Sequence, residues 1–347
     1  MININGNSIG RGFPVYIIAE LSANHNQDLK QAEEIICQAK ACGANAIKLQ
    51  TYTPDTITID CDNRYFHIGA GTIWEGKNLY QLYREAYTPW EWQPRLKDLA
   101  DRLGLDFFSS PFDHTAVDFL ESLNVPAYKV ASFELVDIPL IRRIARTGKP
   151  MIMSTGMATL AEIEEAIQAA KAEGNDQIAL LKCTSAYPAP ETEINLRTIP
   201  HLAASFALPV GVSDHTLGIA VPVAAVALGA AIVEKHLTLS RRAAGPDNAF
   251  SLEPDEFKAM VEAVRTAEKA LGEVKYGPTE QEAASCQFRR SLFVVKDMQE
   301  GELFSGENVR SIRPGCGLHP RYLDLVIGRR VKSNVKRGTP LTWDLIL

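Results

Sequence analysis

AIVEKHLTL, residues 231–239, begins and ends like a strand that is buried on both faces, but its middle is charged. The outer residues are mostly aliphatic or β-branched, which is typical of a parallel strand covered by helices. Glu234, Lys235 and His236 stand between them, and burying such groups is costly unless each finds a partner or a ligand. Because side chains two residues apart share one face of a strand, we expect Glu234 and His236 to point inward together and Lys235 to point outward.

Seven short apolar segments of the same kind precede this stretch, and most are separated by enough residues for a crossover helix. They are VYIIAEL (15–21), AIKLQTY (46–52), DFFSSPF (106–112), AYKVASFE (127–134), PMIMSTGM (150–157), IALLKCTSAY (178–187) and PVGVSDHT (209–216). Eight βα units within roughly 250 residues predict an α/β fold, the (β/α)8 TIM barrel. A doubly wound open sheet is the alternative, and it is disfavoured because no GxGxxG motif follows the first segment.

Two of the intervening segments carry clear helix signals. In residues 159–174, Thr159 and Glu162 form a capping-box pattern and Gly174 supplies a C-terminal stop. Residues 28–43 follow the same pattern and close at Gly43. Both segments predict helices that connect neighbouring barrel strands.

The composition indicates a globular enzyme-sized protein. Hydrophobic residues make up 46% and charged residues 22% of 347 residues, and no apolar run reaches the roughly 18–20 residues that a membrane span needs. The N-terminal residues lack the pattern of a signal peptide. A net charge of −6 argues against nucleic-acid binding, and six cysteines without CxxC spacing fit reduced thiols. We expect a cytoplasmic protein with neither a membrane nor a nucleic-acid partner.

The pattern changes after Gly272. We expect a barrel over residues 1–272, a polar and turn-rich linker over 273–289, and a small β-rich domain over 290–347. MQEGELF (298–304) and VKRGTPL (335–341) form a weak repeat that predicts two β-turn units. A module of about 60 residues buries little surface on its own, so we expect it to pack on another surface.

Polar residues gather late in the predicted strands, usually two apart, where a barrel carries its active site. They are Glu20; Lys48 and Gln50; Lys129, Ser132 and Glu134; Ser185 and Tyr187; Ser213 and His215; and Glu234 and His236. One barrel histidine is usually structural, but two on adjacent strands favour a divalent metal. An isolated lysine is usually snorkelling or paired, whereas Lys48 and Lys129 together favour a phosphate or carboxylate ligand. Glu20 and Glu134 could instead simply neutralise them.

The turn at residues 154–157 and the cysteines can each be interpreted in more than one way. STGM (154–157) predicts a tight turn whose N–H groups could also hold an anion. The cysteines, including Cys183, are expected to be inert packing residues. Taken alone, these residues predict an anion-binding, metal-using barrel enzyme and no particular substrate.

The chain also resembles a known family along essentially its whole length. IIAELSANHNQ, AIKLQTY, YKVASFE, STGMA, TSAYPAP, GVSDHT and EKHLTL resemble the signature segments of the sialic acid synthases, and the tail resembles their antifreeze-like (SAF) domain. The resemblance implies condensation of phosphoenolpyruvate with an N-acetylated amino sugar to a nine-carbon 2-keto acid and phosphate. ELSANHNQ and SIRPGCGLHPRYLD are similar to the pseudaminic acid synthase branch, which implies 2,4-diacetamido-2,4,6-trideoxy-L-altrose as acceptor.

The resemblance also implies roles for individual residues. It makes His215 and His236 the ligands of Mn²⁺ or Mg²⁺. The implied phosphoenolpyruvate contacts are Lys48, Lys129, Ser132, Ser154, Ser213 and Ser185, the last at a position where relatives commonly carry Asn. The implied acid–base and acceptor-side carboxylates are Glu20, Glu134, Glu234 and Asp247, and the implied sugar contacts are Gln50, Tyr187 and Arg313. Arg313 would reach the N-acetyl group in a second subunit's barrel, which implies a domain-swapped homodimer.

Other functions remain open at this stage. The same mechanism with another acceptor would make the chain an N-acetylneuraminate or legionaminate synthase. A pyruvate aldolase of the Schiff-base kind would use Lys129 as nucleophile. A sugar-binding barrel without catalysis, with a tail that mediates assembly, is the alternative outside the enzymes.

Overall fold

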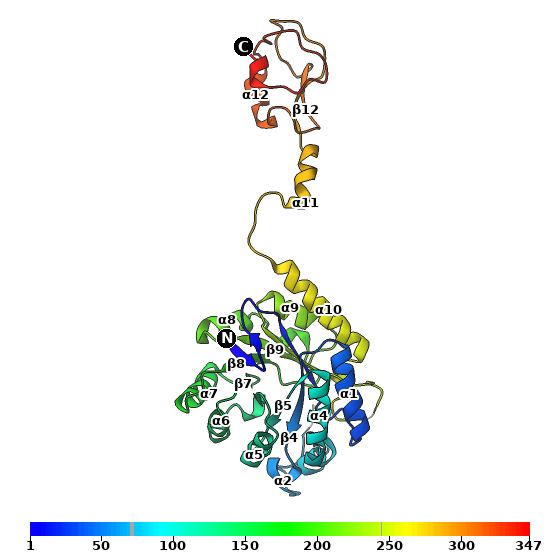
Figure 1. The fold of residues 1–347 in the computed structure, drawn as a ribbon, viewed down its shortest axis with the longest axis vertical. Helices are drawn as coiled ribbons and strands as arrows, with labels where there is room; N and C mark the ends of the chain where they lie inside the picture. Colours follow the sequence, from blue (N-terminus) through cyan, green and yellow to red (C-terminus); the bar gives the residue numbers. More distant parts are fainter. Residues whose placement is uncertain (70–72, 244) are drawn as a thin grey trace. The chain divides into compact units, whose positions relative to one another are not determined.

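The computed structural model describes residues 1–69, 73–243 and 245–347, and it divides into two compact units, residues 1–272 and 273–347. In the first unit, parallel strands pair in chain order and the last pairs with the first, so that the sheet closes into a barrel (Figure 1). The strands are β3 (Tyr16–Glu20), β4 (Ala46–Thr51), β5 (Asp106–Pro111), β6 (Tyr128–Val130), β7 (Met151–Ser154), β8 (Ile178–Cys183), β9 (Val210–Asp214) and β10 (Ile232–His236). The predicted TIM barrel is therefore confirmed.

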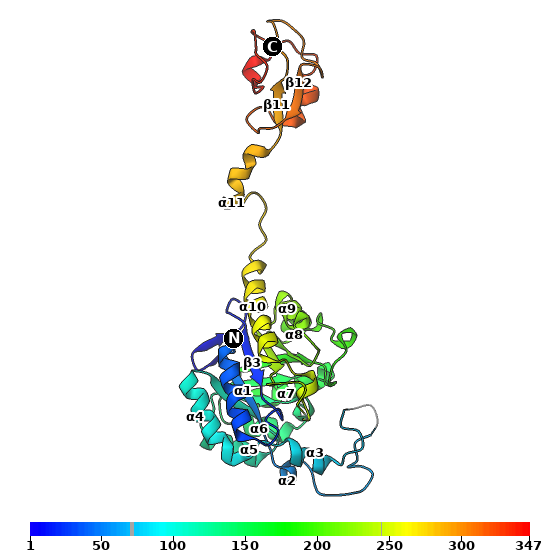
Figure 2. The same cartoon turned by 90° about the vertical axis from the view of Figure 1, so that its right-hand side faces the viewer.

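Helices follow the strands and surround the barrel, as Figure 2 shows from a second side. The α-helices are α1 (Leu29–Ala41), α2 (Pro54–Ile57), α3 (Leu79–Ala86), α4 (Gln93–Leu103), α5 (His114–Ser122), α6 (Ile138–Ala145), α7 (Leu160–Ala172), α8 (Thr198–Phe206), α9 (Ala220–Ala227) and α10 (Pro254–Leu271). The 3₁₀ helices are η1 (Trp90–Trp92), η2 (Ser132–Glu134), η3 (Glu191–Glu193) and η4 (Asn248–Phe250). The capping box of Thr159 and Glu162 begins α7 as predicted, and α1 ends just before Gly43.

Several strands end earlier than their sequence segments predicted. Strand β6 stops at Val130, and Ser132 and Glu134 belong to the 3₁₀ turn η2. The backbone turns there because the Glu134 N–H donates to the Ala131 carbonyl at 3.2 Å. The assignment of Ser132 and Glu134 to a strand was therefore wrong, and they lie on the loop that leaves the strand's C-terminal end.

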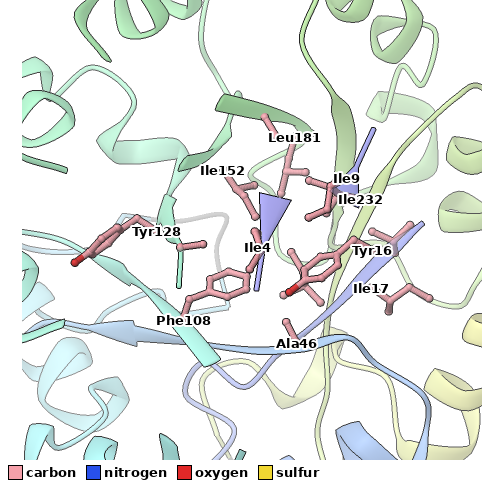
Figure 3. Close-up of a cluster of buried hydrophobic side chains, with 14 of the residues drawn as sticks. Ile4, Ile9, Tyr16, Ile17, Ala46, Phe108, Tyr128, Ile152, Leu181 and Ile232 are labelled. Carbon is pink, nitrogen blue, oxygen red and sulfur yellow. The ribbon is translucent and has the colours of Figure 1, made fainter. Parts of the chain in front are cut away.

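An N-terminal hairpin, β1 (Ile2–Ile4) and β2 (Asn7–Ile9), packs into the barrel's apolar interior. Figure 3 shows Ile4 and Ile9 among inward side chains that include Phe108, Leu181 and Ile232. Side-chain amides of the hairpin reach Asp106, which also accepts a hydrogen bond from the Tyr16 hydroxyl at 2.5 Å. The barrel end beside the hairpin is therefore filled by apolar side chains. The polar side chains predicted from the sequence lie at the opposite end, at the C-terminal ends of the strands.

The second unit has its own small core of aliphatic and aromatic residues around Leu292, Phe304 and Leu341. Its elements are α11 (Glu280–Ala283), η5 (Ala284–Phe288), β11 (Ser291–Val294), β12 (Val309–Ile312), η6 (Pro320–Tyr322), α12 (Leu323–Val326) and η7 (Trp343–Leu345). The two repeat segments pair directly, because Met298 and Val335 exchange backbone hydrogen bonds of 2.8 and 2.9 Å. None of the helices in the described ranges is long and apolar enough to cross a membrane.

Candidate active site

A cavity of about 470 Å³ lies at the ends of the barrel strands and in the loops that follow them. Of the candidate site residues that the sequence predicts, all but Ser185 and Arg313 line it. They are Glu20, Lys48, Gln50, Lys129, Ser132, Glu134, Ser154, Tyr187, Ser213, His215, Glu234, His236 and Asp247. Positions on seven of the barrel strands, or on the loops that follow them, thus converge, as expected for the C-terminal face of a TIM barrel.

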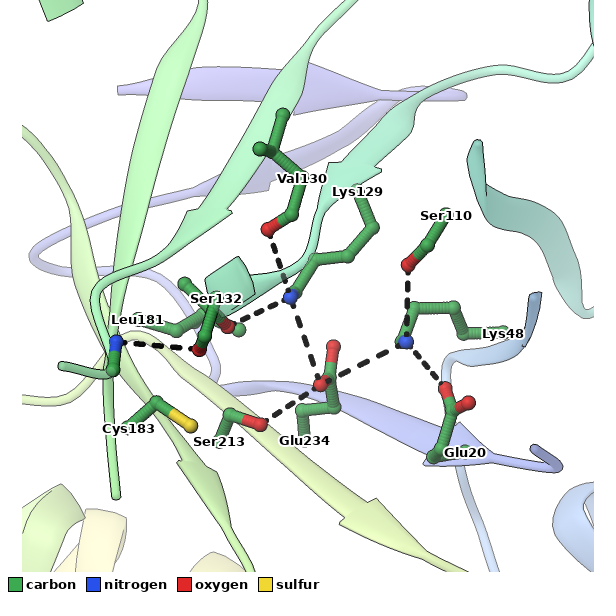
Figure 4. Close-up of polar contacts among 12 residues, drawn as sticks. Glu20, Lys48, Ser110, Lys129, Val130, Ser132, Leu181, Cys183, Ser213 and Glu234 are labelled. Atoms are coloured by element: carbon green, nitrogen blue, oxygen red, sulfur yellow. Dashed lines mark hydrogen bonds and ion pairs between the residues drawn. The ribbon is translucent and has the colours of Figure 1, made fainter. Parts of the chain in front are cut away.

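Two lysines and two glutamates form the floor of this cavity (Figure 4). Lys48 Nζ lies 2.6 Å from Glu20 Oε2, and Glu234 Oε1 lies 3.9 Å from the Nζ atoms of both Lys48 and Lys129. Ser213 Oγ donates to the same Glu234 oxygen at 2.9 Å. All four charged side chains are buried, so each charge acts with little screening by water.

The pKa directions show which of these groups keep their charge. Burial would raise the pKa of Glu234, but Lys129 and Lys48 lower it below its ordinary value. Burial raises the pKa of Glu20, and Lys48 offsets this only in part. Burial lowers the pKa of Lys129, although Glu234 opposes the shift. Glu234 is therefore the firmly ionised carboxylate, while Glu20 is the group that most readily holds a proton.

Lys129 is held in a fixed position by uncharged groups. Its Nζ donates to Ser154 Oγ at 2.7 Å and to the Val130 carbonyl at 3.1 Å. Among the described residues its ion pair is with Glu234 at 3.9 Å, and Lys48 shares that carboxylate. Two cations that share one ionised carboxylate form a site that an anionic ligand would complete.

A chain of hydrogen bonds leads from this floor along the cavity wall. Gln50 Nε2 donates to Glu20 Oε1 at 3.3 Å and to Ser22 Oγ at 2.8 Å, and Ser22 Oγ donates to Asp247 Oδ2 at 2.5 Å. Burial raises the pKa of Asp247, and the Ser22 hydrogen bond lowers it in part. Ser22 was not predicted, although it lies directly after Glu20 and Leu21 in the first polar loop.

His215 and His236 face each other with ring centroids 5.3 Å apart. His215 Nδ1 lies 3.1 Å from the Thr184 carbonyl, so it carries the proton and leaves the Nε2 lone pair available. His236 Nδ1 is buried and has no hydrogen-bond partner among the described residues. Burial and the neighbouring cations lower the pKa of His236 well below its ordinary value, which keeps this imidazole neutral.

These two imidazoles fit a divalent metal ion. A neutral ring with an unpartnered nitrogen and a ring whose other nitrogen is held by a carbonyl are the donors that metals use. In the described part of the chain, no group of three or more His, Cys, Asp or Glu is arranged to hold a metal. The protein would therefore supply two ligands and leave the remaining positions to water or substrate oxygen, as open catalytic sites do.

Glu134 lies at the end of η2 with a pKa raised to about 7. Burial is the main cause, and Lys129 and a backbone hydrogen bond oppose it. Its Oε2 atom has no hydrogen-bond partner in the described ranges. A carboxyl that titrates near neutral pH beside a cavity is suited to accept and release protons.

The turn after β7 packs tightly against two of the serines. The Gly156 N–H donates to Ser132 Oγ at 3.2 Å, and a Cβ atom at Gly156 would overlap the hydroxyls of Ser132 and Ser185. Ser185 lies behind this turn, 3.8 Å from Cys183 Sγ, and does not line the cavity. The turn therefore uses its N–H to position Ser132, and Ser185 supports it from outside the cavity.

Cys183 lines the cavity, with Sγ 3.9 Å from His215 Nδ1. Burial would raise the pKa of this thiol, but His215 lowers it to about 7. In turn, burial would lower the pKa of His215, but Cys183 and the Thr184 carbonyl raise it. Cys183 is therefore more than the inert packing residue that we expected. The sequence signal for this was its position one residue before Thr184, whose carbonyl contacts His215.

The remaining singled-out residues lie elsewhere. Lys235 is fully buried on the side of β10 away from the cavity, where Asp214 Oδ2 and the Thr216 carbonyl each accept a 2.5 Å hydrogen bond from it. Arg313 follows β12 in the second unit, is exposed, and makes no ion pair with any residue that the structure describes.

The polar loop after β3 has a structural part as well. Asn24 Nδ2 donates to the Leu237 carbonyl at 3.0 Å and to Ser251 Oγ at 2.9 Å. His25 is buried, and its Nδ1 accepts from the Gln27 N–H at 3.0 Å. Burial lowers the pKa of His25 to about 4. These residues fix the loop that carries Ser22 to the cavity.

Comparison with known proteins agrees with this geometry. Residues 35–276 match the NeuB family, and residues 289–347 match the SAF domain. The chain belongs to the NeuB family. This finding confirms the resemblance to the sialic acid synthases and to their SAF domain, with the match running through the barrel and the second unit.

Individual NeuB relatives cover nearly the whole chain. The pseudaminic acid synthase of Helicobacter pylori is 45% identical over 333 residues, which are 95% of this chain and 97% of that protein. The N,N'-diacetyllegionaminic acid synthase of Legionella pneumophila is 37% identical over 97% of this chain and 96% of that protein. The crystal structure of an N-acetylneuraminic acid synthetase from Leptospira borgpetersenii in complex with citrate superposes with a TM-score of 0.73 at 33% identity, covering 83% of this chain and 95% of that one.

Proposed function

We propose that this chain is a pseudaminic acid synthase, a transferase that condenses phosphoenolpyruvate with open-chain 2,4-diacetamido-2,4,6-trideoxy-L-altrose and releases phosphate. The observation that carries the proposal is the cavity floor, where Lys48 and Lys129 share the ionised Glu234 beside two imidazoles. The choice of sugar is supported by the 45% identity to the Helicobacter pylori enzyme, against 37% to the diacetyllegionaminic acid synthase of Legionella pneumophila.

Phosphoenolpyruvate would bind at the floor. Its phosphate and carboxylate need cations and hydroxyl donors in a site that excludes water. Lys48 and Lys129 supply the cations, and Ser132, Ser154 and Ser213 supply hydroxyls around them. The two ammonium groups would attract the anion, although Glu234 and Glu20 offset part of their charge.

His215 and His236 would hold the divalent ion, Mn²⁺ or Mg²⁺, which when bound supplies Lewis-acid polarisation of the sugar's aldehyde. The Thr184 carbonyl fixes the His215 tautomer through the 3.1 Å contact at Nδ1, so the lone pair at Nε2 points away from that carbonyl.

The bond changes assign protons to two carboxyls. C3 of phosphoenolpyruvate forms a bond to the aldehyde carbon, and the aldehyde oxygen takes a proton from Glu20, whose pKa burial raises. C2 gains oxocarbenium character and is attacked by water, whose proton passes to Glu134. The bond between C2 and the phosphate oxygen then breaks, the C2 hydroxyl passes its proton to the departing phosphate as the ketone forms, and Lys48 and Lys129 hold that phosphate.

The acceptor would lie along the chain of hydrogen bonds formed by Gln50, Ser22 and Asp247. Tyr187 packs on His215 with ring centroids 4.5 Å apart and closes that side. Arg313 has no ion-pair partner in the described part of the structure, and we propose that it binds the sugar's N-acetyl group in a second copy's barrel within a domain-swapped homodimer. All six cysteines are free, which supports a reducing, cytoplasmic location.

The test is phosphate release from phosphoenolpyruvate with the trideoxy-altrose sugar or with N-acetylmannosamine, each with and without EDTA. The proposal predicts release with the altrose sugar alone and its loss in EDTA. Release with N-acetylmannosamine alone would keep the mechanism and replace the acceptor. If neither sugar causes phosphate release, the chain is better explained as a sugar-binding protein without catalysis.

One observation also favours a Schiff-base aldolase, because burial lowers the pKa of Lys129, as a nucleophilic lysine requires. Borohydride with pyruvate would then trap a covalent adduct on Lys129, and EDTA would leave the activity unchanged. We expect no adduct, because Lys129 Nζ is held by Ser154 and Val130 and has an anion to bind.

A further inference from the structure

The outer wall of the cavity differs in character from its floor. It is formed by the segment that leaves β4 and returns through α3. Its aliphatic lining residues are Ile57, Ile68, Leu79 and Leu82. Tyr52 packs edge-on against Tyr83 and Phe112, with ring centroids 5.6 and 5.1 Å apart, so the wall continues as an aromatic cluster toward the barrel.

This wall is anchored at several points. The Ile68 N–H donates to the Lys77 carbonyl at 2.9 Å, and the Leu79 N–H donates to the Phe66 carbonyl at 2.8 Å. Asn78 caps α3 by accepting from the Tyr80 N–H at 2.8 Å. The backbone around Ile68 and Leu79 is therefore held in place without any ligand.

The wall also contacts the opposite side of the cavity. Trp74 Nε1 donates to the Pro246 carbonyl at 3.1 Å, and its ring lies 5.5 Å from that of Tyr187. Both Trp74 and Pro246 line the cavity, next to Asp247. The apolar wall thus belongs to the same enclosure as the catalytic floor.

If the condensation takes place at the cavity floor of Lys48, Lys129, Glu20 and Glu234, only one end of the acceptor sugar can contact this wall. The aldehyde carbon, C1, must lie beside phosphoenolpyruvate, next to the lysines and the two imidazoles. An open-chain sugar is linear, so its far end, C6, points away from the floor. The wall of Ile57, Ile68, Leu79 and Leu82 lies on that outer side, and these four aliphatic side chains offer a hydroxyl group no hydrogen-bond partner.

We infer that this wall, formed by Ile57, Ile68, Leu79 and Leu82, selects the acceptor by enclosing a deoxygenated C6, a methyl group in place of a hydroxymethyl group. The inference rests on the proposed function. A methyl group there is removed from water at no polar cost, whereas a 6-hydroxyl would lose its water and find no partner among these four side chains. Apolar pockets reject an added hydroxyl by about a hundredfold in kcat/KM.

The test uses two sugars that differ in one atom, 2,4-diacetamido-2,4,6-trideoxy-L-altrose and the same sugar with its 6-hydroxyl retained. Phosphate release gives kcat/KM for each. We expect the wild type to prefer the trideoxy sugar by about a hundredfold. Leu79→Asn and Leu82→Asn each bring an amide of similar volume to the wall, and each should reduce that preference about tenfold with an unchanged KM for phosphoenolpyruvate.

Ile59→Asn is the matched control, because Ile59 lies on the same segment, is 59% exposed and does not line the cavity. Leu82 is buried, so Leu79→Asn, at a half-buried position, decides the question if the Leu82 variant does not fold. A preference unchanged in Leu79→Asn, or changed equally in Ile59→Asn, would overturn the selecting wall while leaving the synthase intact. A wild type silent with both altrose sugars would overturn the proposed function, and the selecting wall with it.

Discussion

Strand β10 places two kinds of buried charge next to each other. Lys235 points away from the cavity and is well paired, since Asp214 and the Thr216 carbonyl both accept from it at 2.5 Å. Asp214 in turn accepts from the N–H and the hydroxyl of Thr216, both at 3.1 Å. Glu234 and His236 point into the cavity, where Glu234 Oε2 and His236 Nδ1 lack any partner among the described residues.

The difference separates a structural charge from a functional one. A buried ion pair whose hydrogen bonds are complete contributes to a unique fold but offers nothing to a ligand. Buried polar atoms without partners are costly in the free protein, and a metal ion, an anion or a sugar can satisfy them. Mutations on the outward face of β10 should therefore lower the stability of the fold, and mutations on its inward face should lower activity.

The largest effect is expected on the outward face. Lys235→Met leaves Asp214 buried without its cation, which should lower the free energy of unfolding by about 3–5 kcal/mol. Denaturant unfolding measures the loss. Lys97→Met, which breaks a partly exposed pair with Asp101 on one helix, should cost less than about 1 kcal/mol. A Lys235 variant as stable as the Lys97 control would contradict the structural assignment.

The inward face should lose activity while keeping its fold. His236→Ala removes one of the two imidazoles, and phosphate release should fall by about a thousandfold, which equals about 4 kcal/mol in the barrier. The unfolding midpoint should stay near that of the wild type, because His236 Nδ1 makes no hydrogen bond that is lost. His114→Ala, on the exposed start of α5, is the control. Wild-type turnover in His236→Ala would remove the metal assignment.

The ionisation of Glu134 should determine how kcat/KM depends on pH. If its carboxylate accepts the proton of the attacking water, kcat/KM rises with pH through its pKa of about 7. Glu134→Gln should lower the rate about 10²–10⁴-fold at pH 8 and abolish that rise. Glu121→Gln, outside the cavity and paired with Lys149, should leave the profile unchanged.

The same group makes an opposite prediction for stability. The folded pKa of Glu134 lies above its unfolded value, so the folded state binds more protons between about pH 4.5 and 7. The free energy of unfolding should therefore fall as pH rises through this window, and Glu134→Gln should remove that fall. An unchanged slope in the variant would show that Glu134 titrates normally.

The smallest effect concerns the second unit. Arg313→Ala should raise the KM for the sugar about tenfold and leave the KM for phosphoenolpyruvate unchanged, because the arginine is proposed to contact only the acceptor. Arg310→Ala, exposed on β12 of the same unit, should change neither. An unchanged sugar KM in Arg313→Ala would refute the domain-swapped arrangement.

Much of the barrel follows from local sequence. The apolar segments and the Thr159 capping box predict its strands and helices because each is a short-range signal. The floor of the cavity follows from the alternation of side chains along each strand, since Lys48, Lys129, Glu234 and His236 occupy inward-facing strand positions that the barrel brings together. When the sheet closes into a barrel, side chains that share this alternation on different strands come close together.

What could not be predicted depends on contacts distant in sequence. The hairpin at the N-terminus has strands of only three residues, too short for periodicity, although Asn5-Gly6 is a turn signal. The apolar wall comes from two short helices and a residue between them, since Ile57 ends the four-residue α2, Leu79 and Leu82 lie on α3, and Ile68 lies in neither. Such short elements carry no long periodic pattern that would predict the wall. The pairing of Cys183 with His215 joins β8 to the loop after β9, and only the folded barrel brings them together.

The most direct test of the inward face as a synthase floor follows the oxygen that bridges C2 and phosphorus. Phosphoenolpyruvate labelled with ¹⁸O at that position would be incubated with the enzyme, a divalent metal and the trideoxy-altrose sugar, and the released phosphate would be weighed by mass spectrometry. Breakage of the C2–O bond predicts that the phosphate carries the label and that none forms without the sugar. Unlabelled phosphate, or release that does not need the sugar, would contradict the synthase mechanism.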